Sequence, residues 1–401
     1  MHWACVLEPR ILLSWSRFSR HLLLASPLQM LLDFLPMRLE DLDYHLPASQ
    51  IAQQPLDRRD ASRLLEINRS ASRLKEHLFR DLVELLRGDE LVVLNNTRVI
   101  PARLFGRRAG VHAQPPSRTT RPEHLTGTVE VFLTRQRDRQ TWEALVRPGR
   151  KMQTGERLLL GEGELEAEVI SRGERGLRTL RFVSRDTRSV SEHLERLGHT
   201  PLPPYIRRKD EVSDRERYQT VFAKQPGSIA APTAGLHFTP EILEKIHGRG
   251  VEICELTLEV GLGTFQPVHT ETLEDHVMHA ESYDIPAETV QRIQQARAAR
   301  RPILAVGTTV VRALEAAALR AAESGSAELL RPGKADARLF IYPGFHFRVV
   351  DALLTNFHLP RSTLLALVCA FAGREKVLGA YHHAVEAGYR FYSYGDCMLL
   401  R

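Results

Sequence analysis

Two spacings of apolar residues divide the chain into a strand-only part and a part where strands and helices alternate. Between Val129 and Val183, short apolar stretches alternate with polar residues and are separated by glycines and charged turns. This period-two pattern predicts an all-β block of about five strands. On both sides of the block, short apolar strands are followed by segments with helical spacing. The sequence therefore predicts an α/β domain interrupted by a small β domain.

Start and stop signals sharpen several elements of the α/β part. The buried strand expected at 303–306 runs through a Gly-Thr-Thr turn into a helix at 310–322. Ser362 caps an apolar helix that ends at Gly373, and Thr239 caps a helix at 240–247. The other expected elements are helices at 78–86 and 191–197 and strands at 91–94, 256–260, 338–342 and 389–394.

Composition narrows the classes of protein that fit. The chain has 401 residues, of which 43% are hydrophobic and 26% are charged, so it can form one large or two medium domains. Its four cysteines form no CxxC pair, which excludes a zinc ribbon or a disulfide framework. No uninterrupted stretch of about 18 apolar residues predicts a membrane span. The net charge is +6, but the Pro- and Arg-rich stretch at 106–128, predicted to be a loop, holds four arginines against one glutamate. Basicity alone is therefore a weak argument for nucleic-acid binding.

A Gly-containing loop at 231–240, with the sequence APTAGLHFTP, leads into a predicted helix start. Small residues let a ligand approach the backbone, and free N–H groups at a helix start attract an anion. His237 stands beside that start. The alternative is a tight turn in which His237 is only hydrogen-bonded.

The segment VGTTVVR at 306–312 repeats this arrangement. Gly307 turns the chain, Thr308 or Thr309 caps the helix, and Arg312 lies one turn into it. A carboxylate or phosphate would be held well there. Strand-to-helix turns with Gly and Thr are common, so a purely structural turn stays open.

Two further motifs resemble cofactor sites, but each lacks a residue that such a site needs. The segment VGLGTF at 260–265 lacks the third glycine of a dinucleotide fingerprint, and Pro267 disfavours the helix that this fingerprint needs. His276, His279 and Glu281 form an HxxHxE pattern, but no third ligand at a diagnostic spacing accompanies it. Hydrogen-bonded residues or substrate contacts are the preferred interpretation, and no metal is expected.

Two late segments combine polar and aromatic side chains. LTNFHLPRSTLL, at 354–365, places Asn356, His358 and Arg361 in a loop before the capped helix. These residues form either the wall of a site or a capping loop. FYSYGD, at 391–396, offers aromatic faces that stack on a base or pack in the core.

Together these motifs resemble the S-adenosylmethionine:tRNA ribosyltransferase-isomerase family. The resemblance covers nearly all of residues 37–401 and extends to IAQQPLDRRDASRLL (51–65), LNNTRVIPARL (94–104), PLPPYIRR (201–208) and YRFYSYGD (389–396). The chain departs from the family in residues 1–36 and in the long stretch after Gly106. Because the family's chains begin where Met37 stands, residues 1–36 are expected to be an extension upstream of the true start rather than a targeting segment.

The resemblance implies a barrel-like α/β domain at 37–103 and 185–401 that carries an inserted β-barrel at 104–184. It implies a cytoplasmic, monomeric transferase of queuosine biosynthesis that needs no metal and no membrane. S-Adenosylmethionine is the expected co-substrate. The expected acceptor is 7-aminomethyl-7-deazaguanine at the wobble position of tRNA, and the expected products are epoxyqueuosine-tRNA, adenine and methionine.

The donor suggests roles for particular residues. Its sulfonium acidifies the neighbouring ribose carbon, so we expect His237 there as proton acceptor or as the group that orients the ribose. Arg312 and the Thr308–Thr309 turn are expected to hold the donor's carboxylate. The other candidates for the base are Glu259, His279, Glu281 and Asp396. The remaining donor-site candidates are Thr233, Ala234, Gly235, Phe238, Gly307, Asn356, His358 and Tyr394.

The tRNA contacts are expected where the chain crosses between the two domains. The candidates are Asn95, Asn96, Arg98, Arg207 and Arg208. Two other classes stay open. A non-catalytic tRNA-binding protein would not need the His, Thr, Asn and Asp motifs of the α/β part. A tRNA methyltransferase using the same donor would be expected to carry the glycine turn that this sequence lacks.

Overall fold

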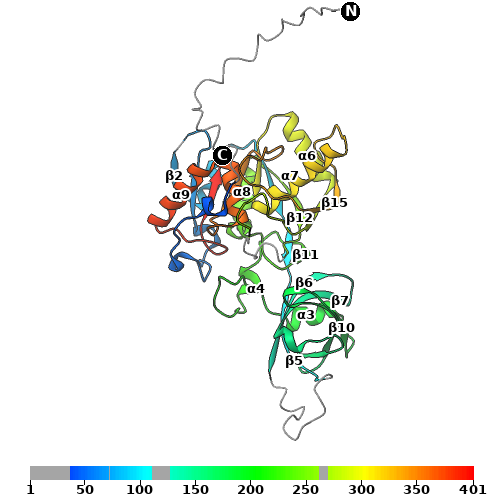
Figure 1. The fold of residues 1–401 in the computed structure, drawn as a ribbon. Helices are drawn as coiled ribbons and strands as arrows, with labels where there is room; N and C mark the ends of the chain where they lie inside the picture. The colour runs from blue at the N-terminus through cyan, green and yellow to red at the C-terminus, as the bar shows by residue number, and fades with distance from the viewer. Residues whose placement is uncertain (1–36, 72, 111–126, 262–269) are drawn as a thin grey trace, which may run out of the picture.

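The computed structural model describes residues 37–71, 73–110, 127–261 and 270–401. The predictions for residues 1–36, for most of the 106–128 loop and for 262–265 of VGLGTF therefore lie outside the described residues. Figure 1 shows two parts, a large sheet covered by helices and a small barrel below it. The predicted α/β class with an inserted β-barrel is confirmed. The outermost strands of the large sheet are not paired with each other, so among the described strands only the small barrel is closed.

The large sheet has nine strands and a parallel centre. In spatial order they are β15 (Gly333–Ala337), β13 (Glu281–Ile285), β12 (Glu252–Leu258), β3 (Leu91–Asn95), β14 (Ile303–Val306), β16 (Ala352–Asn356), β17 (Cys397–Leu400), β1 (Arg63–Ile67) and β2 (Leu74–Leu78). Strands β12, β3, β14 and β16 run parallel. Their carboxyl ends therefore share one edge of the sheet, which we call the carboxyl edge. The opposite edge is the amino edge.

Complete burial explains why the central strands are continuous apolar runs. Every residue of β3, β14 and β16 is buried. Neighbouring residues such as Leu304 and Ala305 belong to different hydrophobic clusters, one on each face of the sheet. This is the pattern of a parallel sheet covered on both faces.

The helices begin and end near the predicted signals. Thr239 caps α5 by accepting the Ile242 N–H at 3.3 Å, and Ser362 caps α8 by accepting the Leu365 N–H at 3.2 Å. The helices are α2 (Leu82–Leu85), α3 (Val190–Leu197), α4 (Asp214–Arg217), α5 (Pro240–Gly248), α6 (Ala287–Ala298), α7 (Thr308–Glu323), α8 (Thr363–Ala372) and α9 (Arg374–Glu386). Among the described residues, none of these helices combines the length and apolarity needed to cross a membrane.

The inserted barrel closes with six strands in the order β10-β7-β6-β5-β8-β9. They are β5 (Arg103–Arg108), β6 (Thr128–Gln136), β7 (Thr141–Arg147), β8 (Arg157–Leu160), β9 (Leu165–Arg172) and β10 (Leu177–Ser184). Five correspond to the predicted alternation. The sixth, β5, includes residues 106–108, which the sequence analysis had placed in the loop. The chain enters and leaves side by side, because the His199 N–H donates to the Arg103 carbonyl at 2.7 Å.

Three local predictions were wrong. The strand expected at 338–342 is β15, at Gly333–Ala337, a polar edge strand without an apolar signature. Residues 389–394 form a turn, in which Tyr392 has φ 75°, and the strand that follows is β17. The helix expected at 78–86 is interrupted, because the Asp81 carboxylate accepts the Leu78 N–H at 2.9 Å and ends β2 before two short helical turns.

Candidate active site

The motifs of the α/β part converge on a small cavity at the carboxyl edge, which we call the motif cavity. It measures about 50 Å³. The loop Ala231–Ala234 lines one side, and the Gly307–Thr309 turn and the end of β16 line another. The Gly307–Thr309 turn and the end of β16 face one cavity because β14 and β16 are parallel neighbours.

His237 lies beside this cavity in a hydrogen-bonded chain. Its Nδ1 is 2.7 Å from the Ser62 Oγ, and its Nε2 is 3.1 Å from the Asn356 Nδ2. The Ser62 hydroxyl donates to the Arg59 carbonyl at 3.3 Å. Ser62 therefore accepts a hydrogen from His237 Nδ1, which leaves the lone pair of the ring on Nε2. The chain fixes both the tautomer and the orientation of the imidazole.

The imidazole of His237 is neutral in the folded chain. It is 4% exposed, and burial lowers its pKa to about 3, with smaller contributions from the Arg59 and Arg390 guanidinium groups. His237 ends a 3-10 helix (Thr233–His237), and burial is the main cause of the lowered pKa. So low a pKa makes the ring a weak base and favours a role as hydrogen-bond acceptor.

Asn356 connects His237 to the motif cavity. Its Nδ2 also donates to the Tyr392 carbonyl at 3.1 Å. Its Oδ1 is buried and accepts no hydrogen bond within the described part of the chain. Because buried acceptors are nearly always satisfied in native proteins, this oxygen is suited to receive a donor from a ligand. Asn356 itself lines the cavity.

The start of α7 gives the motif cavity its anion-binding feature. Gly307, at the N-cap, has φ 93°, which L-residues rarely adopt, and no side chain caps the helix. Thr308 and Thr309 line the cavity, and the Thr309 Oγ1 is fixed by the Asn95 Nδ2 at 3.2 Å. The first N–H groups of this 16-residue helix lack partners within the helix, so they can bind a negative charge.

Arg312 does not reach the motif cavity. It is 5% exposed, and its guanidinium pairs with the buried Glu281 carboxylate of β13. The structure therefore brings Thr308 and Thr309 to the expected carboxylate site but points the Arg312 charge elsewhere. Glu281, one of the candidates for the base, is used in the same ion pair.

The other candidates for the base lie outside the motif cavity. Both carboxylate oxygens of Asp396 accept backbone N–H groups, from Arg63 and Arg390, at 2.8 Å each, although burial raises the pKa of Asp396. Glu259 lies beside Gly227, and burial raises its pKa as well. His279 is exposed.

His358 lines the motif cavity and is neutral. Its Nε2 is 3.0 Å from the Thr355 Oγ1, and burial lowers its pKa to about 3. Its backbone N–H donates to the Tyr381 hydroxyl at 3.1 Å. These contacts hold His358 rigidly in the cavity wall.

Two residues expected in the donor site pack in the core instead. Phe238 makes edge contacts with Phe79 and Phe222. Gly235 is required by packing, since a Cβ there would lie 2.7 Å from the Phe222 ring. Its small size serves an aromatic neighbour rather than a ligand.

Tyr394, the tyrosine expected in the donor site, does not line the motif cavity. The hydroxyl of Tyr394 donates to Asp214 at 2.9 Å, and Tyr394 lines only a second cavity of about 30 Å³ that also contains His237. Tyr205 and Tyr392 line the motif cavity instead, with ring centroids 3.8 Å apart. Sequence reasoning missed both, although they stand in the PLPPYIRR and FYSYGD motifs. The left-handed backbone of Tyr392 is a strained conformation of the kind that clusters at functional sites.

Only part of the expected tRNA-contact group is at the surface. Asn95 and Asn96 are 1% and 8% exposed and hold backbone and side-chain groups of β12 and its neighbours. Arg208 is engaged with Asp214 at 2.6 Å. Arg98 and Arg207 are exposed near the two crossings into the barrel.

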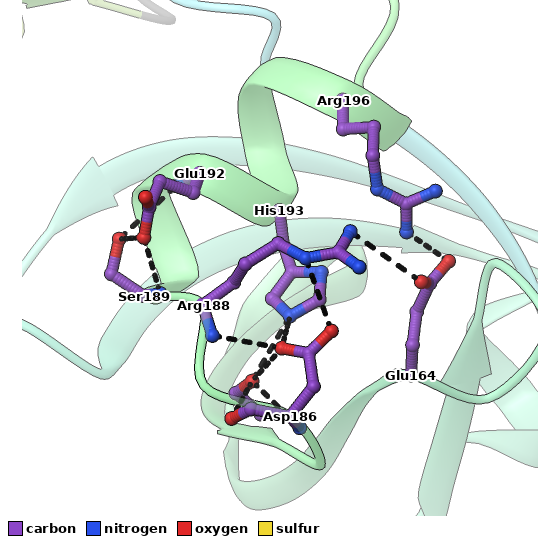
Figure 2. Close-up of polar contacts among 8 residues, drawn as sticks. Glu164, Asp186, Arg188, Ser189, Glu192, His193 and Arg196 are labelled. Atoms are coloured by element: carbon purple, nitrogen blue, oxygen red, sulfur yellow. Dashed lines mark hydrogen bonds and ion pairs between the residues drawn. The ribbon is translucent and has the colours of Figure 1, made fainter.

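One possible metal-ligand group occurs in the described residues. Figure 2 shows Glu164, Asp186 and His193 together, with ligand atoms within 4.8 Å of one another. Arg188 and Arg196 point at the two carboxylates, and the Asp186 Oδ1 is 2.9 Å from the His193 Nε2. The charges of the cluster are already balanced by arginines, so it joins α3 to the barrel as an ion-pair network.

Comparison with known proteins agrees with the motifs. Residues 39–400 match a family model described as queuosine biosynthesis protein. The chain belongs to this family. An S-adenosylmethionine:tRNA ribosyltransferase-isomerase of Solibacter usitatus is 52% identical over 91% of this chain and 100% of its own length. The enzyme of the same name from Moorella thermoacetica is 48% identical with the same coverage. A solved S-adenosylmethionine tRNA ribosyltransferase of Thermotoga maritima is 36% identical, covers 90% of this chain and 100% of its own, and gives a TM-score of 0.48.

Membership confirms the resemblance drawn from the motifs and the expectation of an enzyme of the transferase class in queuosine biosynthesis.

Proposed function

We propose that this enzyme transfers and isomerises the ribosyl group of S-adenosylmethionine onto 7-aminomethyl-7-deazaguanine at the wobble position of tRNA. The products are epoxyqueuosine-tRNA, adenine and methionine, and the enzyme acts as a monomer in the cytoplasm without a metal. Family membership supports the donor and the tRNA. The observation that carries the proposal is the juxtaposition, at one cavity, of a helix start and the Ser62–His237–Asn356 chain.

The donor carries one carboxylate and one sulfonium, and the cavity offers a partner for each. We assign the carboxylate to the start of α7, at Thr308 and Thr309, without Arg312. The faces of Tyr205 and Tyr392 suit the sulfonium, since aromatic rings attract cations. The open Oδ1 of Asn356 suits a ribose hydroxyl.

His237 is assigned to the ribose as an orienting group. The Nε2 lone pair of His237 accepts the Asn356 Nδ2–H at 3.1 Å, so His237 acts through Asn356 by holding the unpaired Oδ1 of that amide in place for the ribose. The second cavity is lined by His237 and shares Ser393 with the motif cavity. Nothing in this assignment requires His237 to carry a proton through the reaction.

Donor binding requires the cavity walls to move. Cavities of about 50 Å³ and 30 Å³ are far smaller than the roughly 300–1,000 Å³ of typical small-molecule sites. Opening the wall formed by Ser393 would join them. We therefore expect donor binding to protect this wall, the segment 391–396, from hydrogen exchange.

Mass spectrometry of the tRNA product tests the proposal. Purified enzyme is incubated with S-adenosylmethionine and tRNA that carries 7-aminomethyl-7-deazaguanine. The proposal predicts the epoxycyclopentane adduct together with one adenine per product. A gain of one methyl group would identify a methyltransferase. Unchanged tRNA, with binding retained, would identify a non-catalytic binding protein.

A further inference from the structure

A third and larger cavity opens at the amino edge of the same sheet. It measures about 640 Å³, and we call it the arginine cavity. Leu304 of β14 and Ala352 of β16 form part of its floor. The carboxyl ends of these two strands lead into the motif cavity, so the two cavities lie at opposite edges of the sheet. None of the family motifs lines the arginine cavity.

The lining carries an excess of positive charge. Five arginines face two acidic residues, Glu90 and Asp351. The Glu90 carboxylate accepts the backbone N–H groups of Arg87 and Gly88 at 2.9 and 3.0 Å, and Asp351 accepts from Arg297 and from the Ile303 N–H. Both acids therefore already have partners within the protein.

The arginines differ in how many hydrogen bonds and ion pairs they make within the protein. Arg297, Arg301 and Arg401 donate to carboxylates and carbonyls of the protein. Arg87 is largely exposed, and its Nε lies 3.6 Å from the Asp89 carboxylate and 3.7 Å from the Glu90 carboxylate. Arg300 is exposed and makes no side-chain hydrogen bond or ion pair with the described residues. Among the described residues, the Arg300 guanidinium and the two Nη groups of Arg87 therefore remain for a ligand.

Arg300 occupies a backbone position that favours glycine. It follows the C-cap of α6 with φ 55°, and the Arg301 N–H donates to the Ala296 carbonyl at 2.8 Å. Helices α7 and α9 end with the same bond pattern, and they place Gly325 and Gly388 at the equivalent position, each with φ 70°. An arginine at this position opposes the backbone preference that the other two helices follow. Local folding does not account for Arg300, whereas a role of its side chain in the cavity does.

We propose that the arginine cavity binds an organic phosphate. Arg87 and Arg300 contact the phosphate, and the apolar floor of Leu304, Ala352 and Leu399 contacts the organic part. The volume suits a ligand of nucleotide size rather than a bare ion. The site is separate from the proposed donor site, which lies at the opposite edge of the sheet.

Calorimetric titration of the full chain with phenyl phosphate tests this site, because that probe does not resemble the donor. Saturable binding is expected with a Kd of about 1 mM or below, and inorganic phosphate should bind several-fold more weakly. Arg300→Gly should weaken phenyl phosphate binding about 10-fold or more. The same variant should raise the thermal unfolding midpoint by about 1–2 °C, since glycine suits the backbone. Arg331→Ala, an exposed arginine outside the cavity, is the matched control and should leave binding unchanged.

Several results would overturn the proposal. These are absence of saturation, equal binding by Arg300→Gly, or a lower unfolding midpoint for that variant. Displacement of phenyl phosphate by S-adenosylmethionine would place the probe in the motif cavity. Displacement by tRNA, with a parallel loss of tRNA affinity in Arg300→Gly, would make the cavity part of an RNA interface.

Discussion

The two edges of the central sheet handle charge in opposite ways. At the carboxyl edge the cavity is small, its histidines are neutral, and the nearby Arg312 charge is consumed by Glu281. At the amino edge the cavity is more than ten times larger, and Arg300 has no protein partner among the described residues. The same strands, β14 and β16, reach both edges. Their carboxyl ends lead into side chains fixed by hydrogen bonds, which suits chemistry, whereas their amino ends border an open cationic surface, which suits reversible binding.

Replacing Arg312 tests whether charge at the carboxyl edge is balanced internally. Arg312→Ala leaves the buried Glu281 carboxylate without this partner, so we expect a loss of about 3–5 kcal/mol in the free energy of unfolding. Urea unfolding measures it. The double variant Arg312→Met/Glu281→Gln removes both charges and should recover most of the loss. A stable Arg312→Ala enzyme with a raised KM for the donor would instead assign Arg312 to the donor carboxylate.

Lowering the pH should reduce the free energy of unfolding through the carboxyl edge, because two histidines there are neutral in the folded chain. The pKa of His237 and that of His358 are each about 3 in the folded chain, against about 6.5 when unfolded. Below pH 6.5 the unfolded chain therefore binds more protons, so this stability is present above pH 6.5 and is lost as the pH falls toward 3. We expect each histidine to cost roughly 2 kcal/mol between pH 7.5 and pH 5.

Urea unfolding at the two pH values checks the acid effect. His358→Gln should remove about half of the acid sensitivity. If that variant and the parent lose the same stability between pH 7.5 and pH 5, these histidines do not titrate as the structure implies.

Removing one hydroxyl tests whether the orientation of His237 matters. Ser62→Ala removes the partner of the buried His237 Nδ1–H, so turnover should fall by about 10-fold or more with little change in donor affinity. Single-turnover kinetics separates the two quantities. Ser62→Thr, which keeps the hydroxyl, is the matched control and should retain more activity. Equal turnover in Ser62→Ala and the parent would show that the chain is only structural.

Arginines at the barrel crossing should contribute the smallest effects. Arg98→Gln and Arg207→Gln each remove one exposed charge, so tRNA affinity should fall modestly and the salt slope should decrease by about one unit per phosphate contact. Filter binding across salt concentrations measures it. Arg208→Gln is the contrasting variant, since loss of its ion pair with Asp214 should lower stability. Unchanged salt slopes for both exposed arginines would remove them from the interface.

Much of the fold could be predicted from residues that mark helix ends and from the periodicity of apolar positions. Gly307, Ser362 and Gly373 mark helix ends, and alternation marks the barrel strands. The failures have local causes. The edge strand β15 is polar, so it carries no apolar pattern. Tyr392 adopts a left-handed turn that aromatic content at 389–394 does not reveal.

The site was less accessible from sequence because its contacts are long-range. Ser62, His237 and Asn356 are separated by 175 and 119 residues, and only the sheet brings them together. The polar residue types of the motifs indicated a site, but not which residues face the cavity and which, like Phe238, face the core. The arginine cavity had no sequence signature, since its arginines come from three distant segments.

The central claim is that the reaction occurs at the carboxyl edge, and single-turnover release of adenine tests it most directly. His237→Ala and Arg300→Gly change one residue at each edge, and His193→Gln, a buried histidine of α3, is the control for His237. With saturating donor and tRNA, His237→Ala should slow adenine release by about 100-fold or more, whereas Arg300→Gly and His193→Gln should stay within about 2-fold of the parent. Near-parental release by His237→Ala, or a large loss in Arg300→Gly, would contradict the account.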